Sequence, residues 1–290
     1  MTVRGCRGAP TVAVLTLSLS SAMADAQGGA PALEAVLAKA GDYVSRYADT
    51  FSNVVAEERS RQWWQLGDAI TSRTTLAEMV FVRLPGALPW GTFRDVFERD
   101  GRSVRPRDRR LEALFVQAPA DALQQANAIL RQSASHNLGP VYRTANIPTL
   151  ALLFLLPENG RRFAFERQGQ RRFGGTVGVE ISFKEQATPT LVHDYGNNDT
   201  PASGRFWIDA SRGAVLRSEV SYRVRGEEAA FVATEYRSEP RFDILVPGVM
   251  SELYLVPGGG RIEVTSQYSK YRRFSVSVEE RLAPGAPDRP

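Results

Sequence analysis

The sequence predicts an α+β protein in which one large antiparallel sheet carries most of the chain. The first observation is a β-hairpin, with a strand at 204–208, a polar turn at 209–213 and a returning strand at 214–222. More strand-like segments follow it with short turns between them, which is typical of antiparallel neighbours. Amphipathic helices are indicated only earlier, at 32–50 and 120–134. We expect the hairpin to lie in the middle of the sheet.

The first 26 residues predict a secretory signal peptide. Arg4 and Arg7 precede an apolar run at 11–19, and small residues then allow cleavage after Ala24 or Ala26. The run is too short to span a bilayer, and the order of the three parts favours a signal peptide over a buried N-terminal helix. We therefore expect a periplasmic or secreted protein.

The rest of the chain predicts an exported protein without disulfides, membrane spans or nucleic-acid partners. Cys6, the only cysteine, precedes the apolar run, whereas a lipid-acceptor cysteine would follow it. No later stretch approaches the 18 or so apolar residues that a transmembrane helix needs. The formal net charge is only +4, and arginines alternate with acidic residues, which indicates a solvated surface. An anionic membrane surface stays an alternative partner.

One helix and three extended segments are expected before the hairpin turn at Asp100-Gly101. Leu33, Leu37, Ala40 and further apolar residues share one face of the helix at 32–50, which predicts a packing helix or one that lies over a cavity. An extended segment, a polar turn and two strands follow. Both faces of the strand at 76–84 are apolar, so we expect this strand to be covered on both sides. The extended segment is 51–64, the polar turn is 67–75, and the two strands are 76–84 and 90–98.

A hairpin turn and a charge run come next. Asp100-Gly101 is a strong signal for a two-residue hairpin turn. The run Arg105–Arg110 is interpreted as a solvated loop, with binding of phosphate or an acidic partner as the alternative.

A helical insert is expected at about 111–156. It begins with helices at 111–115 and 120–134. The apolar run 149–156 predicts either a short buried helix capped by Thr149 or a buried strand, because periodicity cannot separate the two.

The second half of the chain predicts a series of strands. Val177, Val179, Ile181 and Phe183 alternate with polar or small residues, which indicates a strand with one buried face. We expect one domain over 27–280 and a disordered tail over 281–290. The predicted strands beside the hairpin are 162–166, 176–183, 229–237, 247–255 and 261–274.

Motifs for catalysis, cofactors and metals are missing. No H-E-x-x-H, Walker A or G-x-G-x-x-G sequence occurs, and His136 and His193 lie far apart beside loop-like residues. His193-Asp194 could belong to a triad, but no G-x-S-x-G elbow is present. Asp209 and Ser211 are ordinary turn residues. We expect no metal, no cofactor and no enzyme activity.

Residues of the hairpin carry a resemblance to a known family. Trp207-Ile208-Asp209 and Gly213-Ala-Val-Leu-Arg217 resemble a strand pair of the LolA-like superfamily of outer-membrane lipoprotein carriers and related envelope proteins. The chain is also similar to a group of uncharacterised exported bacterial proteins. The segments that carry this second similarity are Phe51–Glu58, Asn146–Phe154 and Tyr268–Phe274.

The resemblance implies a strongly curved antiparallel sheet, an open half-barrel, with helices covering the concave side. It also implies an apolar cavity for acyl chains and no catalysis. The chain departs from the family in its larger size and in the helical insert at about 111–156.

These observations favour a periplasmic, non-enzymatic protein that binds lipid, lipoprotein acyl chains or another apolar ligand. One apolar face of the hairpin would line the ligand site if the turn keeps its register, or would fill a dry core. An envelope sensor or scaffold that binds a protein partner is the first alternative, and an unrecognised hydrolase is the second. The ligand-binding residues predicted by alternation are Phe206, Ile208, Leu216, Val220 and Tyr222.

Overall fold

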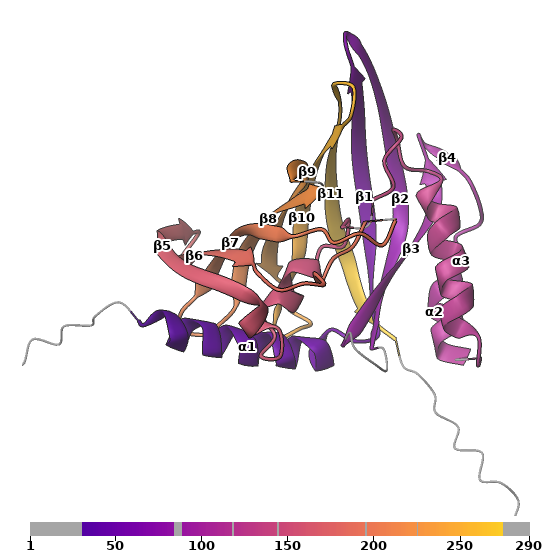
Figure 1. Cartoon of the computed structure of the whole chain (residues 1–290). Helices are drawn as coiled ribbons and strands as arrows, with labels where there is room; N and C mark the ends of the chain where they lie inside the picture. Colours follow the sequence, from indigo (N-terminus) through magenta and orange to yellow (C-terminus); the bar gives the residue numbers. More distant parts are fainter. Residues whose placement is uncertain are drawn as a thin grey trace, which may run out of the picture. The chain divides into compact units, whose positions relative to one another are not determined.

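Eleven strands form one antiparallel sheet in the computed structural model of the chain (Figure 1). The structure describes residues 31–83, 89–117, 119–143, 145–194, 196–224 and 226–274. Within these residues the sheet runs from one edge to the other without closing. The predicted fold class, an α+β chain with an open antiparallel sheet, is confirmed. The predicted signal peptide at 1–26 and the predicted tail at 281–290 lie outside the described residues.

Strands adjacent in the sheet are adjacent in the chain, apart from the pairing of β1 with β11. The order is β4-β3-β2-β1-β11-β10-β9-β8-β7-β6-β5. The strands are β1 Val54–Leu66, β2 Ala69–Arg83, β3 Trp90–Arg99, β4 Arg102–Ser103, β5 Phe163–Phe173, β6 Thr176–Glu185, β7 Ala202–Asp209, β8 Val215–Val224, β9 Glu227–Ser238, β10 Leu245–Val256 and β11 Gly260–Arg273.

The predicted hairpin is formed by β7 and β8, but it does not lie in the middle of the sheet. The two strands are third and fourth from the β5 edge, and β10 is the central strand. The prediction of a central position was wrong because β1 pairs with β11, at the other end of the described chain, and so adds the first four strands on the far side.

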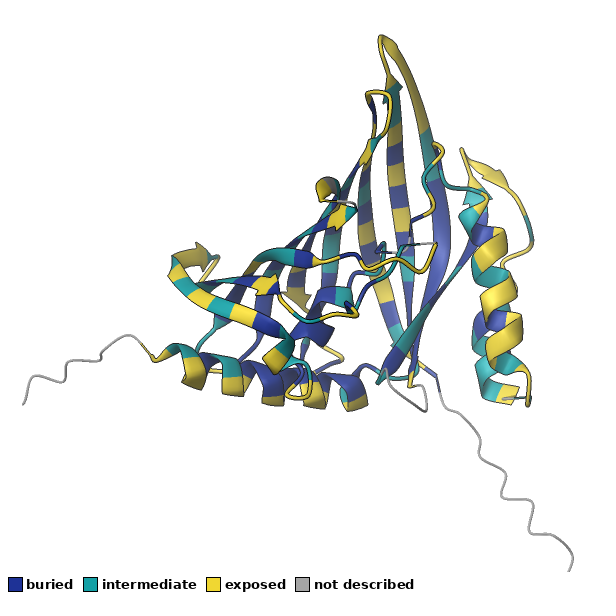
Figure 2. Cartoon of the chain, in the orientation of Figure 1, coloured by how far each residue is buried: buried dark blue, intermediate teal, exposed yellow. Residues whose placement is uncertain are grey.

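Two turns show how local sequence sets the hairpins. Asp100 and Gly101 have φ values of 52° and 74°, and a two-residue turn of this kind needs positive φ at both positions. This confirms the predicted turn between β3 and β4. The turn between β1 and β2 is shorter than the predicted polar segment at 67–75, because β2 already begins at Ala69. The polar residues that follow are strand residues near the exposed tip of this hairpin (Figure 2).

The face of the sheet that carries the main core, which we call the inner face, is packed against two helices. They are α1 Leu33–Thr50, which confirms the predicted helix, and the 3₁₀ helix η1 Leu150–Leu155. The buried helix predicted as one alternative at 149–156 is therefore correct. Thr149 does not cap it, since its hydroxyl accepts a hydrogen bond from Trp90 Nε1 at 3.0 Å. A Cβ on Gly41 would lie 3.2 Å from the Leu155 carbonyl oxygen, so glycine allows α1 to approach η1 closely.

The opposite, outer face of β1–β3 is covered by α2 Arg110–Gln117 and α3 Ala122–Ala134 (Figure 1). Leu111 and Leu114 of α2 pack there with strand residues such as Val80. This confirms that the strand predicted at 76–84 is covered on both sides within its described part. Helices were expected on one face of the sheet, and α1 and η1 cover the inner face, whereas α2 and α3 cover the outer face.

The charge run Arg105–Arg110 is not simply a solvated loop. Arg105 and Arg110 form ion pairs with Asp95, and Arg107 Nη2 lies 2.7 Å from Glu57 Oε2. These carboxylates belong to β3 and β1, and Asp95 is fully buried. The acidic partners of the run are therefore carboxylates of this chain, a pairing that the sequence does not reveal because the partners lie on other elements.

The remaining strands confirm the predicted pattern with shifted ends. The strand expected at 162–166 is the first part of the longer β5, which follows the short 3₁₀ helix η2 Gly160–Arg162. On β6, Val179, Ile181 and Phe183 are buried as predicted, while Val177 is 40% exposed near the strand's beginning. No helix in the described part of the chain has the length and apolar character that crossing a membrane requires.

Candidate functional site

A mainly apolar cavity of about 640 Å³ lies on the inner face, at the ends of three strands. Its size falls within the roughly 300–1,000 Å³ that is usual for ligand pockets. The strands β8, β9 and β10 contribute one wall and two connecting segments contribute the other. The lining residues are Val141, Tyr142, Ala145, Val192, Asp194, Thr200, Tyr222, Val224, Glu227, Ala229, Ala230, Tyr254, Leu255, Val256 and Pro257.

The strand pairing explains why space is left here. Tyr222 of β8 is paired with Ala230 of β9, and Ala230 is also paired with Tyr254 of β10. Directly paired residues project from the same face of a sheet, so a methyl group lies between two long aromatic side chains. All three residues are at least nine-tenths buried. The short side chain of Ala230 therefore forms the floor of a hollow that a larger residue would fill.

Most of the residues that line the cavity are apolar, and two carboxylates, Asp194 and Glu227, are among them. Burial raises the pKa of Tyr222 and Tyr254 well above the usual value for a phenol, so both hydroxyl groups stay neutral. The Tyr254 hydroxyl donates a hydrogen bond to Glu252 Oε2, and burial also raises the pKa of the Glu252 carboxyl group. Glu227 is exposed and Asp194 is partly buried. Such a lining suits an apolar part of a ligand, with a few polar side chains beside it.

The predicted site residues lie mostly in the core. Phe206, Ile208 and Val220 are at most 2% exposed and belong to the main core of the inner face. Phe206 stacks on Phe183, with ring centroids 4.7 Å apart. Of the five predicted residues, Tyr222 is the one that lines the cavity.

Leu216 does not share the inner face, so the prediction of a common face was wrong for this residue. A register shift in the pairing of β7 with β8 separates Trp207 from Ile208 and leaves Leu216 as the extra residue of a bulge. Its Cδ1 lies near the outer side of Gly178, next to Trp207. One inserted residue reverses the alternation on which the prediction depended.

Several lining residues have no signal in the sequence pattern. Val141, Ala145 and Val192 come from connecting segments without helical or strand periodicity. Ala230 and Tyr254 lie in predicted strands, but only the pairing of those strands brings them together. The sequence could have identified their strands but not the row that they form.

The histidines do not form a catalytic group within the described residues. His136 lies near Arg73 and Arg99, and burial, together with these two cations, lowers its pKa. His193 Nε2 lies 3.5 Å from Asp199 Oδ1. No hydrogen bond joins either ring to a serine in the part of the chain that is described, and no group of acidic, histidine or cysteine side chains there could hold a metal ion.

Comparison with known proteins gives distant structural matches. No family model and no curated protein matches the sequence. The similar solved structures include a candidate outer-membrane lipoprotein-sorting domain from Vibrio parahaemolyticus, at 11% identity and a TM-score of 0.40 over 83% of this chain and 95% of that one. A LolA superfamily protein from Nitrosomonas europaea matches at 9% identity and a TM-score of 0.35, over 86% and 96%.

A third match is the lipoprotein LppX of Mycobacterium tuberculosis, at 13% identity and a TM-score of 0.27, over 85% of this chain and 100% of that one. A LolA superfamily structure is thus among the matches. At these scores the likeness is remote, and the function proposed below depends on the geometry of the cavity.

Proposed function

We propose that the protein is a periplasmic, non-enzymatic binding protein for lipid, lipoprotein acyl chains or another apolar ligand. The observation that supports this is the cavity of about 640 Å³ between Tyr222, Ala230 and Tyr254. Burying the apolar surface of a ligand there is favourable by about 25 cal/mol per Å². Most of the lining residues are apolar, which favours binding of an apolar part of a ligand.

The direct test is binding of a fluorescent long-chain fatty acid, combined with mass spectrometry of lipids extracted from protein purified from bacterial cells. We expect saturable binding of one probe molecule and a lipid that copurifies with the protein. A protein that carries no lipid and does not bind the probe would refute the proposal.

Replacement of Ala230 by phenylalanine should abolish this binding selectively. The new ring would occupy the floor between Tyr222 and Tyr254, so we expect the dissociation constant of the probe to rise at least tenfold, about 1.4 kcal/mol. The measurement is a fluorescence titration of each purified variant. Stability is followed in parallel by thermal unfolding, since a ring placed at a buried position can also strain the core.

Ala164→Phe provides the matched control. Ala164 is an exposed residue of the edge strand β5, outside the cavity. The same chemical change there should leave the affinity for the probe within twofold of the unchanged protein. Equal affinities of Ala230→Phe and the unchanged protein would place the probe elsewhere and contradict the proposed site.

A sensor or scaffold that binds an envelope protein is the second candidate, favoured by a different observation. The tip of the β1–β2 hairpin exposes large apolar side chains, with Leu66 50% and Ile70 66% exposed. Exposed apolar groups on a projecting element are typical of contact surfaces. A lipid-free protein that captures one envelope protein, and loses it on Ile70→Ser, would favour this function.

A further inference from the structure

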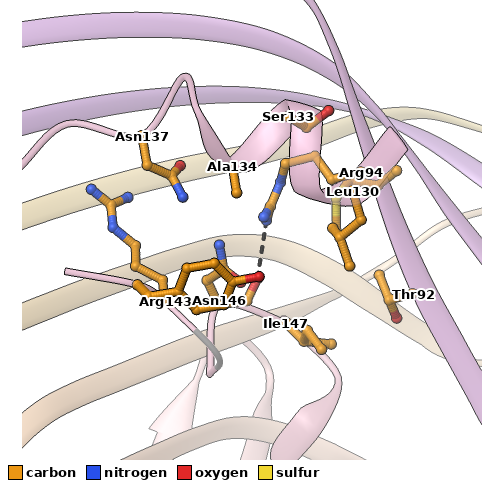
Figure 3. A pocket seen from close by; sticks show the side chains of 11 residues that line it. Thr92, Arg94, Leu130, Ser133, Ala134, Asn137, Arg143, Asn146 and Ile147 are labelled. Carbon is orange, nitrogen blue, oxygen red and sulfur yellow. Dashed lines mark hydrogen bonds between the residues drawn. The ribbon is translucent and has the colours of Figure 1, made fainter. Parts of the chain in front are cut away.

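Two connecting segments complete the wall of the apolar cavity, and the first is held by a charged pair of the sheet. It contributes Val141, Tyr142 and Ala145 to the lining. In Figure 3 Arg94 extends toward Asn146, the residue that follows Ala145, and its Nη2 donates to the Asn146 carbonyl oxygen at 3.0 Å. Arg94 Nε and Nη2 also donate to the two carboxylate oxygens of Glu58, each at 2.8 Å. This part of the wall therefore has a charged attachment to β1 and β3.

The second connecting segment joins β6 to β7, and its described residues form two arms, 190–194 and 198–201. The backbone N–H of Thr200 donates to the Val192 carbonyl oxygen at 3.1 Å, which ties one arm to the other. Both of these residues are buried, and both line the cavity. The position of the arms therefore determines how much space remains between this segment and the strands.

Glu185, the last residue of β6, attaches both arms to the sheet. Its Oε1 accepts a hydrogen bond from Leu191 N at 2.8 Å, and its Oε2 accepts one from Ala202 N at 3.3 Å. Leu191 belongs to the first arm, and Ala202 directly follows the second. The Glu185 side chain is fully buried, and Arg162 Nε lies 3.7 Å from its Oε1. One carboxyl group thus binds the backbone at the base of both arms.

One row of residues leads from Glu185 into the cavity. Ala202 is paired with Tyr222 on the next strand, and Tyr222 is paired with Ala230. Tyr254 is paired with Ala230 from the other side, so the two tyrosines stand two strands apart. Neighbouring strands are about 4.8 Å apart, so roughly 10 Å separates the two tyrosine backbones, and their rings occupy part of this width. The slot that remains over Ala230 suits one unbranched hydrocarbon chain.

We propose that Glu185 is a specificity-determining residue that sets the width of this slot through the two arms, and that the preferred ligand is an amphiphile with an unbranched chain. This inference rests on the proposed function. Burial raises the pKa of Glu185, whereas its two backbone donors and Arg162 favour the ionised form. These contacts offset part of the cost of burying the group. Their loss would release at least one arm, and a wider slot would admit branched chains.

The test compares hexadecanoic acid with its methyl-branched derivative phytanic acid, because the two share chain length and head group but differ in width. Affinities are measured by displacement of the fluorescent fatty acid. We expect the unchanged protein to bind the straight acid about tenfold more tightly, the order expected for extra methyl groups in an apolar pocket. Glu185→Gln should reduce this preference to about twofold, since an amide presents one acceptor oxygen where the carboxyl group presents two. Glu166→Gln, at an exposed position of the neighbouring strand β5, is the matched control and should keep the preference.

Thr190→Val is the second variant, in case Glu185→Gln does not fold. The Thr190 hydroxyl accepts from Thr200 N at 2.9 Å and donates to the Val192 carbonyl oxygen at 2.6 Å, so it links the two arms. Valine has a similar shape and no hydroxyl, so the preference for the straight acid should fall in the same direction, by about threefold. Hydrogen exchange provides a local readout, because the two backbone amides that Glu185 binds should exchange faster in Glu185→Gln.

The outcomes separate the two proposals. No binding of either acid by the unchanged protein contradicts the apolar binding function, on which the inference rests. Equal binding of the two acids by the unchanged protein leaves that function intact and overturns the inferred preference for an unbranched chain. A preference that both Glu185→Gln and Thr190→Val retain, or an equal loss of affinity for both acids in Glu185→Gln, assigns Glu185 to stability alone and overturns its role in specificity.

Discussion

Replacing Gly204 with alanine is expected to lower the free energy of unfolding by about 3 kcal/mol. Gly204 lies in β7, paired with Val220 of β8. A Cβ built on it would lie 1.9 Å from the carbonyl oxygen of Glu219 and 3.0 Å from the ring of Phe183. The first of these atoms is backbone, so β8 would have to move away and its pairing with β7 would weaken. Thermal and urea unfolding measure the change, with an expected fall in Tm of roughly 6–12 °C.

Gly169→Ala is the control for the Gly204 substitution. Gly169 is also a strand residue, in β5, but no atom lies within 4 Å of a Cβ built there. Alanine at such a position restricts the unfolded chain and should leave stability unchanged or raise it by about 0.4–1 kcal/mol. Equal stabilities of Gly204→Ala and the unchanged protein would mean that β7 and β8 are farther apart than described.

The same hairpin shows which parts of the fold the sequence could predict. Alternation and turn residues act between neighbours in the chain, so the strands at 204–208 and 214–222 were found, as was the turn at Asp100-Gly101. The place of the hairpin in the sheet depends on the pairing of β1 with β11, which joins segments some 200 positions apart and has no local signal. The sheet was therefore predicted correctly in kind but not in order.

The candidate site was harder to predict for two physical reasons. A one-residue bulge moved Leu216 to the outer face, although the alternation on either side of it is regular. The cavity itself is left by a small residue, Ala230, between two large ones on other strands. Hydrophobicity alone cannot separate a residue that fills a core, such as Phe206, from one that borders a void, such as Tyr222.

The ion pairs on the outer face were also hard to predict from the sequence. The run Arg105–Arg110 looked like a solvated loop because its acidic partners lie in the strands. Glu57, Glu78 and Asp95 come from β1, β2 and β3, and each forms an ion pair with at least one arginine of the run. The ion pairs link the segment before α2 to the sheet, and so contribute to the position of the helices behind it.

Asp95→Ala should therefore destabilise the protein by about 3 kcal/mol, since removing one partner of a buried ion pair leaves the other charge uncompensated. Asp95 is fully buried and accepts from Arg105 Nε at 2.9 Å and from Arg110 Nε at 2.8 Å. The change should show as lower thermal stability. It should also increase amide hydrogen exchange in α2, because Arg110 is the first residue of that helix.

Asp108→Ala tests whether the loss of any acidic partner of Arg105 would destabilise the protein as much as the loss of Asp95. Asp108 Oδ1 accepts from Arg105 Nη1 at 2.7 Å, but its side chain is 55% exposed. Exposed ion pairs contribute only about 0–1 kcal/mol, so this variant should unfold close to the unchanged protein. If both aspartate variants were equally mild, the arginines would be compensated by solvent, and α2 would be held by its apolar contacts through Leu111 and Leu114. A large loss confined to Asp95 would instead assign the position of α2 to the buried carboxylate of β3.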